Sequence, residues 1–322
     1  MILIVSQSND SSTGDVMDWL SAWGKQVVRV NDNDTIRSIR ITMDKQSVSV
    51  RLLCGNKEID LSEVESFWFR RGGFVFDVPS FSDVNWEYVP HLQEHLMDEC
   101  RTMKDFFVSL LENKPSLGNY HQGNANKLYS LYVARKVGLA IPQTIVSSSK
   151  ADLLAFYGNN RSCITKSVQD VLSFQTKTHW YGTTTSKVVA DDVARMHDSF
   201  FPSQLQAEVR KRYELRIFYL KGKCYSMAIF SQENEQTSLD FRNYCEEKPN
   251  RYVPYLLPDE IEEKIGMFMR KMDLDTGSLD MIVTPEQEYV FLEVNPVGQY
   301  DMISVPCNYY LHKRVAKVLC HE

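Results

Sequence analysis

The chain has 322 residues, of which 43% are hydrophobic and 24% charged, so it can bury a sizeable core. Its formal charge of −6, without any strongly basic stretch, argues against a nucleic-acid partner, and no apolar run approaches the length of a membrane span. Seven scattered cysteines without a C-x-x-C spacing indicate reduced thiols, so we expect a cytoplasmic protein that is neither secreted nor inserted in a membrane.

The first part of the chain predicts an α/β lobe. An apolar run at 2–5, a polar loop, a helix near 16–24 and a strand near 26–30 indicate a β-α-β unit. The loop offers only Gly14 and lacks a G-x-G-x-x-G pattern, which argues against a dinucleotide-binding dehydrogenase. Strands near 39–42, 47–53 and 66–69 and a helix over 86–112 complete the lobe. Arg70 and Arg71 leave the last strand for a glycine turn, a common place for ligand-binding residues, and their role stays open.

A linker and a second lobe follow. Residues 113–126 contain a proline, two glycines and four asparagines, which interrupt the periodic pattern. The elements expected after them are a helix over 127–137, a strand at 141–146, a helix at 152–157, a strand at 163–166, hairpins within 167–189 and a helix at 190–200. Asp191 or Asp192 would cap the last of these helices.

From residue 205 the chain becomes rich in β-strands. Strands are expected at 206–209, 214–220 and 224–231, then a helix at 259–272 and two final strands. In the last strand, Glu293 and Asn295 share one face while Leu292 and Val294 share the other. If residues 284–288 form a tight turn, Asp280 lies opposite Glu293.

This pair of carboxylates predicts a metal site. Facing carboxylates repel each other unless a cation lies between them, and oxygen ligands around an open site suit magnesium that carries nucleotide phosphates. The strands around them are otherwise apolar, and Pro296 restrains Asn295 to extended geometry, which argues against a merely solvated hairpin.

The order and type of these features resemble the ATP-grasp ligase superfamily over nearly the whole chain. The residues that carry the resemblance are Lys127, Lys166, 206–209, Glu214-Leu215-Arg216, Asp280 and Glu293-Val294-Asn295-Pro296. Within the superfamily, segments 126–129, 239–242 and 291–296 with Gly298-Gln299 are similar to the graspetide synthetases, which include the microviridin-type ligases. The chain resembles most the grasp-with-SPASM branch of these peptide maturases.

The resemblance implies an α/β (α+β) ATP-grasp fold with three parts. A pre-ATP-grasp domain would span 1–115, a central lobe with a leader-binding region 116–204, and a C-terminal lobe with the magnesium site 205–322. The central and C-terminal lobes would enclose ATP.

The resemblance also implies roles for individual residues. Lys127 and Lys166 would contact the ATP phosphates, and the hinge Gln206, Ala207, Glu208 and Val209 would hold adenine through the backbone of Ala207 and Val209. Either Glu208 or Glu214 would reach the ribose. Asp280, Glu293 and Asn295 would bind magnesium, with two ions expected, and Arg216 and Arg242 would hold the transferring phosphate and the substrate carboxylate. Asp191 and Asp192 would contact a leader peptide.

Each of these residues also has an ordinary structural explanation when it is taken alone. The lysines fit a solvated surface, the hinge fits a buried strand, and the arginines fit surface ion pairs. The order in which they occur favours the ATP site.

The implied function is an ATP-dependent peptide ligase. It would phosphorylate Asp or Glu side chains of a ribosomal precursor peptide, with leader and core, and join them to Thr or Ser as ω-esters or to Lys as ω-amides. The resemblance also suggests a homodimer. One alternative is a RimK-like ligase that adds an amino acid to a protein tail or a small metabolite, and another is a binding module that has lost catalysis.

Overall fold

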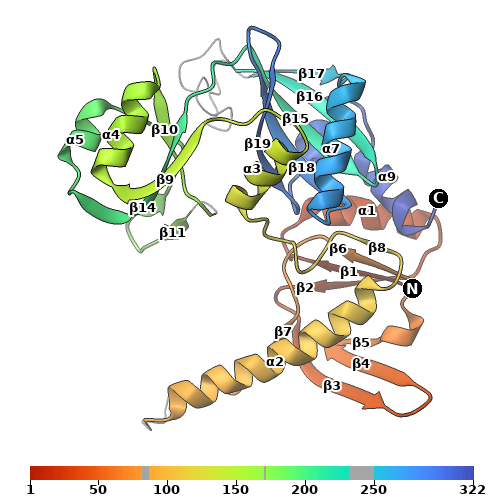
Figure 1. The fold of residues 1–322 in the computed structure, drawn as a ribbon. Helices are drawn as coiled ribbons and strands as arrows, with labels where there is room; N and C mark the ends of the chain where they lie inside the picture. Colours follow the sequence, from red (N-terminus) through yellow and green to blue (C-terminus); the bar gives the residue numbers. More distant parts are fainter. Residues whose placement is uncertain (82–86, 170–171, 232–249) are drawn as a thin grey trace. The chain divides into compact units, whose positions relative to one another are not determined.

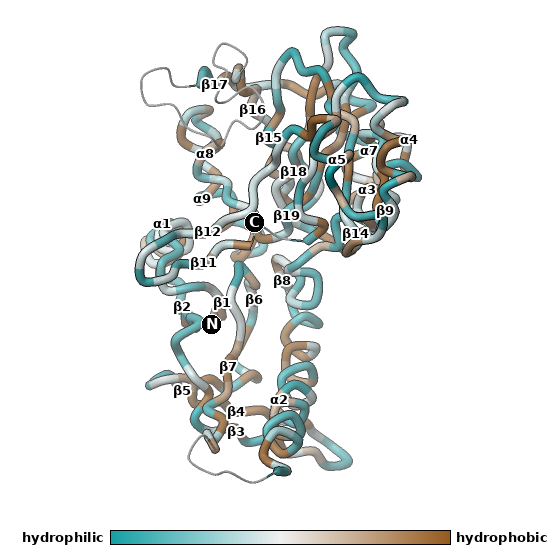
Figure 2. The backbone as a smooth tube through the Cα atoms, turned by 90° about the vertical axis from the view of Figure 1, so that its left-hand side faces the viewer, coloured by the Kyte–Doolittle hydropathy of each residue, from teal (hydrophilic) through white to brown (hydrophobic). Residues whose placement is uncertain are grey.

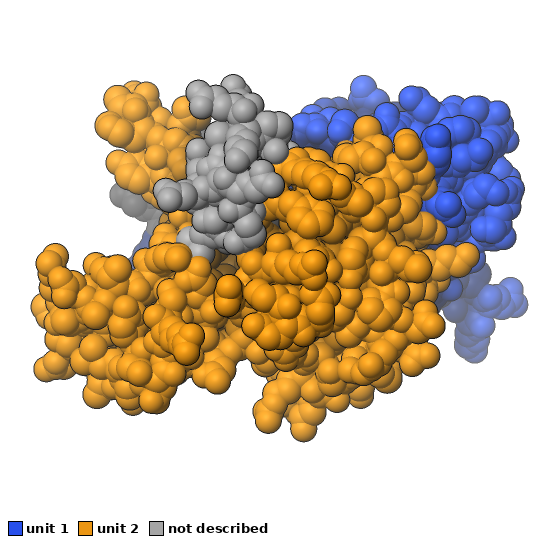
Figure 3. Space-filling view, turned by 90° about the horizontal axis from the view of Figure 1, so that it is seen from above, with its two compact units in different colours: residues 1–123, 310–322 blue, residues 124–309 orange. Residues whose placement is uncertain are grey.

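The computed structural model describes residues 1–81, 87–169, 172–231 and 250–322. The chain divides into two compact units, which Figure 3 colours separately. Unit 1 comprises residues 1–123 and 310–322, and unit 2 comprises residues 124–309. Because the C-terminal segment returns to unit 1, the boundaries of these units differ from a simple division along the chain. The three-part division expected from the sequence remains a prediction.

Unit 1 is built on a parallel sheet with strand order β2-β1-β6-β8. Its strands are β1 (Ile2–Ser6), β2 (Val27–Asn31), β6 (Ser66–Phe69) and β8 (Ser116–Leu117). Every residue of β1 and β6 is buried, as expected for strands that are covered on both faces. Helix α1 (Ser11–Ala22) packs beside α9 (Leu311–Leu319) (Figure 1).

Two sequence predictions in this unit are corrected by hydrogen bonds. The first helix begins at Ser11, earlier than expected, because the Asp10 carboxylate accepts the Thr13 N–H at 3.0 Å and caps its first turn. The expected linker contributes β8, whose residues Ser116 and Leu117 pair with Phe67 and Trp68. The linker is therefore partly a strand of the sheet.

A second sheet of unit 1 has the order β5-β4-β3-β7. It consists of β3 (Thr35–Met43), β4 (Val48–Cys54), β5 (Lys57–Asp60) and β7 (Val75–Phe76), and η1 (Leu61–Glu63) follows β5. Helix α2 (Val89–Glu112) buries Phe107, Val108 and Leu111 near its C-terminal end. Figure 2 shows that hydrophilic and hydrophobic segments alternate along α2. Trp86, where the helix was expected to begin, lies outside the described residues.

Unit 2 begins with helix α3 (Lys127–Lys136) and a sheet of order β13-β10-β14-β9. Its strands are β9 (Thr144–Ser149), β10 (Cys163–Thr165), β13 (Ser186–Val188) and β14 (Ser199–Ala207). Helices α4 (Lys150–Asn159) and α5 (Ala190–Arg195) contact each other, and Leu153, Cys163, Val193 and Leu205 form a small core. The strands β11 (Ser173–Gln175) and β12 (Trp180–Gly182) form a separate exposed hairpin.

The helix expected over 190–200 is shorter than predicted. Helix α5 ends at Arg195, and β14 begins at Ser199. Pro202 favours extended backbone in the residue before it, which opposes a helix across this segment. The capping expectation is also wrong in position: Val189 is the N-cap residue, and the Asp192 carboxylate accepts the Val189 N–H at 3.3 Å from inside the first turn.

The second sheet of unit 2 is antiparallel, with the order β17-β16-β15-β18-β19. Its strands are β15 (Tyr213–Leu220), β16 (Lys223–Phe230), β17 (Arg251–Tyr255), β18 (Thr276–Val283) and β19 (Tyr289–Asn295). Helices α3 and α7 (Asp259–Lys271) cover one face, where Leu131, Phe268, Ile217 and Met281 belong to one core. A short helix, α8 (Asp301–Ser304), follows β19. None of the described helices is both long and apolar enough to cross a membrane.

Candidate active site

The strands β18 and β19 bring two carboxylates face to face. Asp280 pairs with Glu293, which confirms the register expected from the sequence. The turn between the strands is closed by the Thr284 N–H, which donates to the Glu288 carbonyl at 3.0 Å. Close to this turn Val283 pairs with Tyr289. Continued without interruption, that register would place Leu292 opposite Asp280.

A β-bulge between Asp280 and Met281 adds the missing residue on β19. Met281 pairs with Phe291 and Asp280 with Glu293, so Leu292 is the extra residue. This corrects the prediction that regular alternation places Leu292 and Val294 on one face, opposite to that of Glu293 and Asn295. Phe291 and Val294 lie in the core beneath α3 and α7, whereas Leu292 is half-buried. The bulge thus shifts the in-and-out alternation of β19 by one residue, so that Glu293 faces Asp280 and its neighbour Val294 faces the core.

Asp280 is held by an arginine of the neighbouring strand. Arg216 lies opposite Asp280 in the β15–β18 register, and its Nη1 donates to both carboxylate oxygens at 2.7 Å. Both side chains are about nine-tenths buried. The ion pair compensates part of the cost of burying each charged side chain, and it fixes the orientation of the Asp280 carboxylate.

Two lysines from different elements converge on Glu293. Lys127 is the first residue of α3, and its Nζ lies 3.9 Å from Glu293 Oε2. Lys166 follows β10 directly, and its Nζ lies 3.8 Å from the same oxygen. The sequence separates these residues widely, but the fold places both ammonium groups at one carboxylate.

The charges of this cluster fit magnesium and a polyphosphate. Two carboxylates face each other and require a cation between or beside them, while three protein cations surround them. Hard oxygen ligands suit magnesium, and lysine and arginine suit phosphate oxygens. Asn295 is exposed two pairs further along, opposite Ser278, and its Oδ1 accepts the Val297 N–H at 3.1 Å.

The expected hinge at 206–209 is largely engaged within the central sheet. Gln206 is buried, and its Nε2 donates to Thr144 Oγ1 at 2.9 Å. The Ala207 N–H donates to the Gln143 carbonyl at 2.9 Å. This amide hydrogen therefore already has a partner inside the protein, whereas Val209 lies beyond the end of β14 and is half-buried.

Two acidic residues were candidates for the ribose contact, and both have polar partners. The Glu208 carboxylate accepts Ser162 Oγ at 2.6 Å and lies 3.1 Å from Lys187 Nζ. Neither partner could be found from the sequence, since both come from other strands or loops.

Glu214 is more deeply buried and lies on the face of Arg216 and Asp280. Its Oε1 pairs with Lys211 and accepts Ser231 Oγ at 2.9 Å. Burial raises the pKa of Glu214 above its ordinary value, although Lys211 and Ser231 act to lower it. Lys211 is thus a buried cation near the site that sequence reasoning missed.

Three predicted residues lie away from this cluster or outside the described chain. Asp191 and Arg195 form an exposed ion pair of 3.9 Å on α5. The Asp192 carboxylate accepts a hydrogen bond from the backbone N–H of Val189, the N-cap residue of the same helix. Arg242 and the segment 239–242 lie outside the described residues. The roles of these residues remain predictions.

Comparisons with known proteins agree with this arrangement. Residues 1–124 match the family model of the MvdD pre-ATP grasp domain. No curated protein matches the chain. A RiPP-associated ATP-grasp ligase of Chryseobacterium gregarium, solved with ADP and a leader and core peptide, is 24% identical and superimposes with a TM-score of 0.83. That match covers 99% of this chain and 96% of the ligase.

Two macrocyclases of Microcystis aeruginosa MRC are also similar. MdnC, solved with the precursor peptide MdnA, is 25% identical with a TM-score of 0.80, and the match covers 100% of this chain and 99% of MdnC. MdnB is 23% identical with a TM-score of 0.74 and coverages of 99% and 98%. The expected ATP-grasp fold with a pre-ATP-grasp domain is confirmed, as is the resemblance to graspetide-type maturases.

Proposed function

From its ATP-grasp ligase fold, we propose that the chain is an ATP-dependent peptide ligase that closes rings in a ribosomal precursor peptide with leader and core. The observation that carries this proposal is the convergence of Lys127 and Lys166 on Glu293, opposite the Asp280–Arg216 pair. This cluster has the charges needed to hold a magnesium nucleotide beside a carboxylate that must be activated.

The nucleotide would bind where the two sheets of unit 2 meet. Lys127 and Lys166 would leave Glu293 for the phosphate oxygens, and Asp280, Glu293 and Asn295 would hold two magnesium ions. Bound magnesium would neutralise the phosphate oxygens and so permit a substrate carboxylate to approach. Adenine would lie at 206–209 with the Val209 N–H as donor, and Glu214 or Glu208 would reach the ribose.

The reaction would proceed in two balanced steps. An Asp or Glu carboxylate oxygen of the peptide attacks the γ-phosphorus, and the bond between this phosphorus and the bridging β-phosphate oxygen breaks. ADP is the leaving group, and the peptide carboxylate becomes an acyl phosphate. A Thr or Ser hydroxyl, or a Lys amine, then attacks the acyl carbon, phosphate leaves, and the nucleophile loses its proton. Arg216 and Arg242 would stabilise the charge on the transferred phosphoryl group, because a guanidinium fork binds such oxygens bidentately.

The remaining parts of the chain would serve this reaction. We assign 1–115 as the pre-ATP-grasp domain, 116–204 as the central lobe and 205–322 as the C-terminal lobe. Asp191 and Asp192 would contact the leader. A cytoplasmic homodimer is proposed; the six described cysteines are free thiols, in keeping with that compartment.

Mass spectrometry tests the proposal directly. The chain is incubated with Mg-ATP and with any short peptide, rich in Thr and acidic residues, that a gene next to its own encodes. We expect the loss of one water for each ring, together with ADP, and no such product from Asp280→Ala. Addition of a glutamate residue would instead favour a RimK-like ligase, and absence of any ADP release would leave a binding module.

A further inference from the structure

The carboxyl end of the parallel sheet in unit 1 gathers charged side chains that the proposed chemistry does not use. Strand β1 lies between β2 and β6, and the chain reaches β2 through α1. The connection after β1 therefore leads to β2 on one side, whereas the chain after β6 leads on to β8 on the other side. In open α/β sheets, ligands bind at the carboxyl ends of strands where the connections diverge in this way.

Two consecutive arginines converge on one oxygen at this place. Arg71 Nε lies 2.8 Å from Asp10 Oδ2, and Arg70 Nε lies 3.4 Å from the same atom. Neighbouring residues of a strand point to opposite faces, so both arginines reach Asp10 only because β6 has ended at Phe69. The turn that follows contains Gly72 at φ 76°, where a Cβ would lie 2.7 Å from the Ser6 carbonyl oxygen. The turn is thus pressed against the end of β1.

Asp10 orients these guanidinium groups and is itself held rigidly. Its Oδ1 accepts the Thr13 N–H at 3.0 Å and Ser12 Oγ at 2.9 Å, which leaves Oδ2 toward the arginines. Burial acts to raise the pKa of Asp10, but Arg70, Ser12 and Arg71 outweigh it, and the pKa lies below its ordinary value. The carboxylate therefore stays ionised at neutral pH.

A third guanidinium completes the cluster. Arg29 Nη2 donates to the carbonyl oxygens of Gln7 and Asp10, the latter at 3.2 Å. Anchoring the cap of α1 requires one cation, whereas two guanidinium groups converge on the Asp10 carboxylate and a third binds the backbone carbonyl of the same residue. Side by side, like charges are costly unless an anion lies between them, and guanidinium forks bind carboxylates bidentately.

We propose that Arg71, oriented by Asp10 and supported by Arg70, binds the carboxylate of an acidic side chain of the peptide substrate. Arg71 is the contact residue because about a fifth of its side chain is exposed, compared with 4% for Arg70. Asp10 holds Arg71 through Nε, and the substrate carboxylate approaches its two Nη groups. The identity of the ligand rests on the proposed function, whereas the binding of a carboxylate does not.

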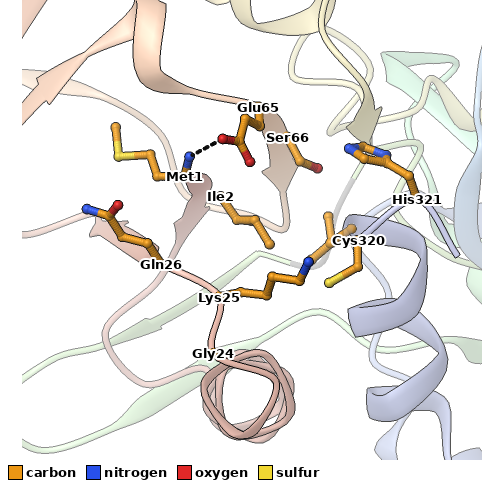
Figure 4. Close-up of a pocket in the computed structure, with 10 residues that line it drawn as sticks. Met1, Ile2, Gly24, Lys25, Gln26, Glu65, Ser66, Cys320 and His321 are labelled. Atoms are coloured by element: carbon orange, nitrogen blue, oxygen red, sulfur yellow. Dashed lines mark ion pairs between the residues drawn. The ribbon is translucent and has the colours of Figure 1, made fainter.

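The amino ends of the strands in the same sheet supply a cation that serves as a matched control. A cavity of about 250 Å³ lies at the amino ends of β1 and β6, and Lys25 lines it with Met1, Glu65, Cys320 and His321 (Figure 4). Lys25 belongs to the same unit but sits at the other end of the strands. Its replacement changes the charge of unit 1 without touching the arginines.

The test measures peptide binding to the full chain in the absence of ATP. An acetylated and amidated Thr-Glu-Thr peptide and its Thr-Gln-Thr counterpart are titrated into protein whose arginines are ¹⁵N-labelled. We expect the Glu peptide to shift the Nε signals and to bind about tenfold more weakly to Arg71→Gln. The affinity of Arg71→Lys for the Glu peptide should lie between those of the unaltered chain and Arg71→Gln, because an ammonium keeps the charge but lacks the guanidinium fork. Lys25→Gln should bind the peptide like the unaltered chain.

Equal binding of the two peptides, or unchanged binding in Arg71→Gln, would overturn the proposal. Inorganic phosphate is titrated in parallel, and binding of phosphate without binding of the Glu peptide would overturn the carboxylate assignment. Thermal melting of each variant checks that it is folded, and Arg71→Lys keeps the charge if Arg71→Gln does not fold. Because no turnover is measured, this result is separate from the mass-spectrometric test of the ligase.

Discussion

Lys127 and Lys166 act on one carboxylate but come from separate elements, so their substitutions can be compared directly. Each ammonium lies just under 4 Å from Glu293 Oε2. Lys127→Ala or Lys166→Ala should raise the KM for ATP about tenfold or more, because each loses a charge-assisted phosphate contact of roughly 1.5–3 kcal/mol. Steady-state ADP release measures the effect. Lys136→Ala, on the same helix as Lys127 but over the Tyr132 ring, is the control and should leave KM unchanged.

The Asp280–Arg216 pair predicts a second result for single residues. Asp280→Ala removes a buried carboxylate and leaves Arg216 without that partner, so we expect loss of turnover and destabilisation by about 3 kcal/mol or more. Asp280→Asn keeps the shape and separates the two effects. Chelation of magnesium from the unaltered chain should abolish ADP release, and added magnesium should restore it. Substantial turnover by Asp280→Ala would contradict the metal assignment.

Among the elements, the β18–β19 hairpin shows how a bulge serves the site. The bulge accommodates the extra residue Leu292, so that Phe291 and Val294 both enter the core while Glu293 faces Asp280. Deleting Leu292 would retain the Asp280–Glu293 pair but give a regular strand with less local twist. We expect a folded protein whose melting temperature changes little and whose KM for ATP rises severalfold, since Glu293 no longer aims at the lysines.

The control for this deletion is Leu292→Ala, which keeps the extra residue. Leu292 is only half-buried, so this change should cost little stability and preserve KM. Equal kinetics of the deletion and the substitution would show that the bulge has no part in aiming Glu293.

At the scale of the molecule, the two units should respond to acid in opposite ways. Asp10 in unit 1 has a lowered pKa, so its stabilising contribution is present above about pH 3.8 and is lost as the pH falls through the lower folded value. Glu214 in unit 2 has a pKa raised above 4.5, so its contribution is complete below that pH and is lost as the pH rises through the folded value.

Amide hydrogen exchange, resolved by peptide, measures both units in one sample. As the pH falls from about 6 to about 3, exchange corrected for its intrinsic pH dependence should show unit 1 losing stability through Asp10 and unit 2 gaining it through Glu214. Asp10→Asn should flatten the pH dependence of the stability of unit 1, and Glu214→Gln should flatten that of unit 2. If either variant retains the slope of the unaltered chain, the corresponding residue does not govern it.

Local pattern and residue order were sufficient for many of the strands, such as β1, β4, β6 and β15, for the ATP-grasp resemblance and for the pairing of Asp280 with Glu293. Alternation, turn chemistry and charge are properties of neighbouring residues, so they can be read along the chain. The Leu292 bulge could not be predicted, because it depends on how Phe291 and Val294 pack beneath α3 and α7. The strand in the expected linker likewise exists only because β6 offers it a partner.

The convergence of charges was decided by tertiary structure alone. Lys127, Lys166 and Glu293 come from a helix, the end of a short strand and a hairpin, and no local rule brings their charged atoms within 4 Å. The same holds for Arg70, Arg71 and Asp10 in unit 1. The sequence determined which charged groups exist and in what order, whereas the packing of sheets and helices determined which of them share a site, because contact between distant residues arises only when their elements fold together.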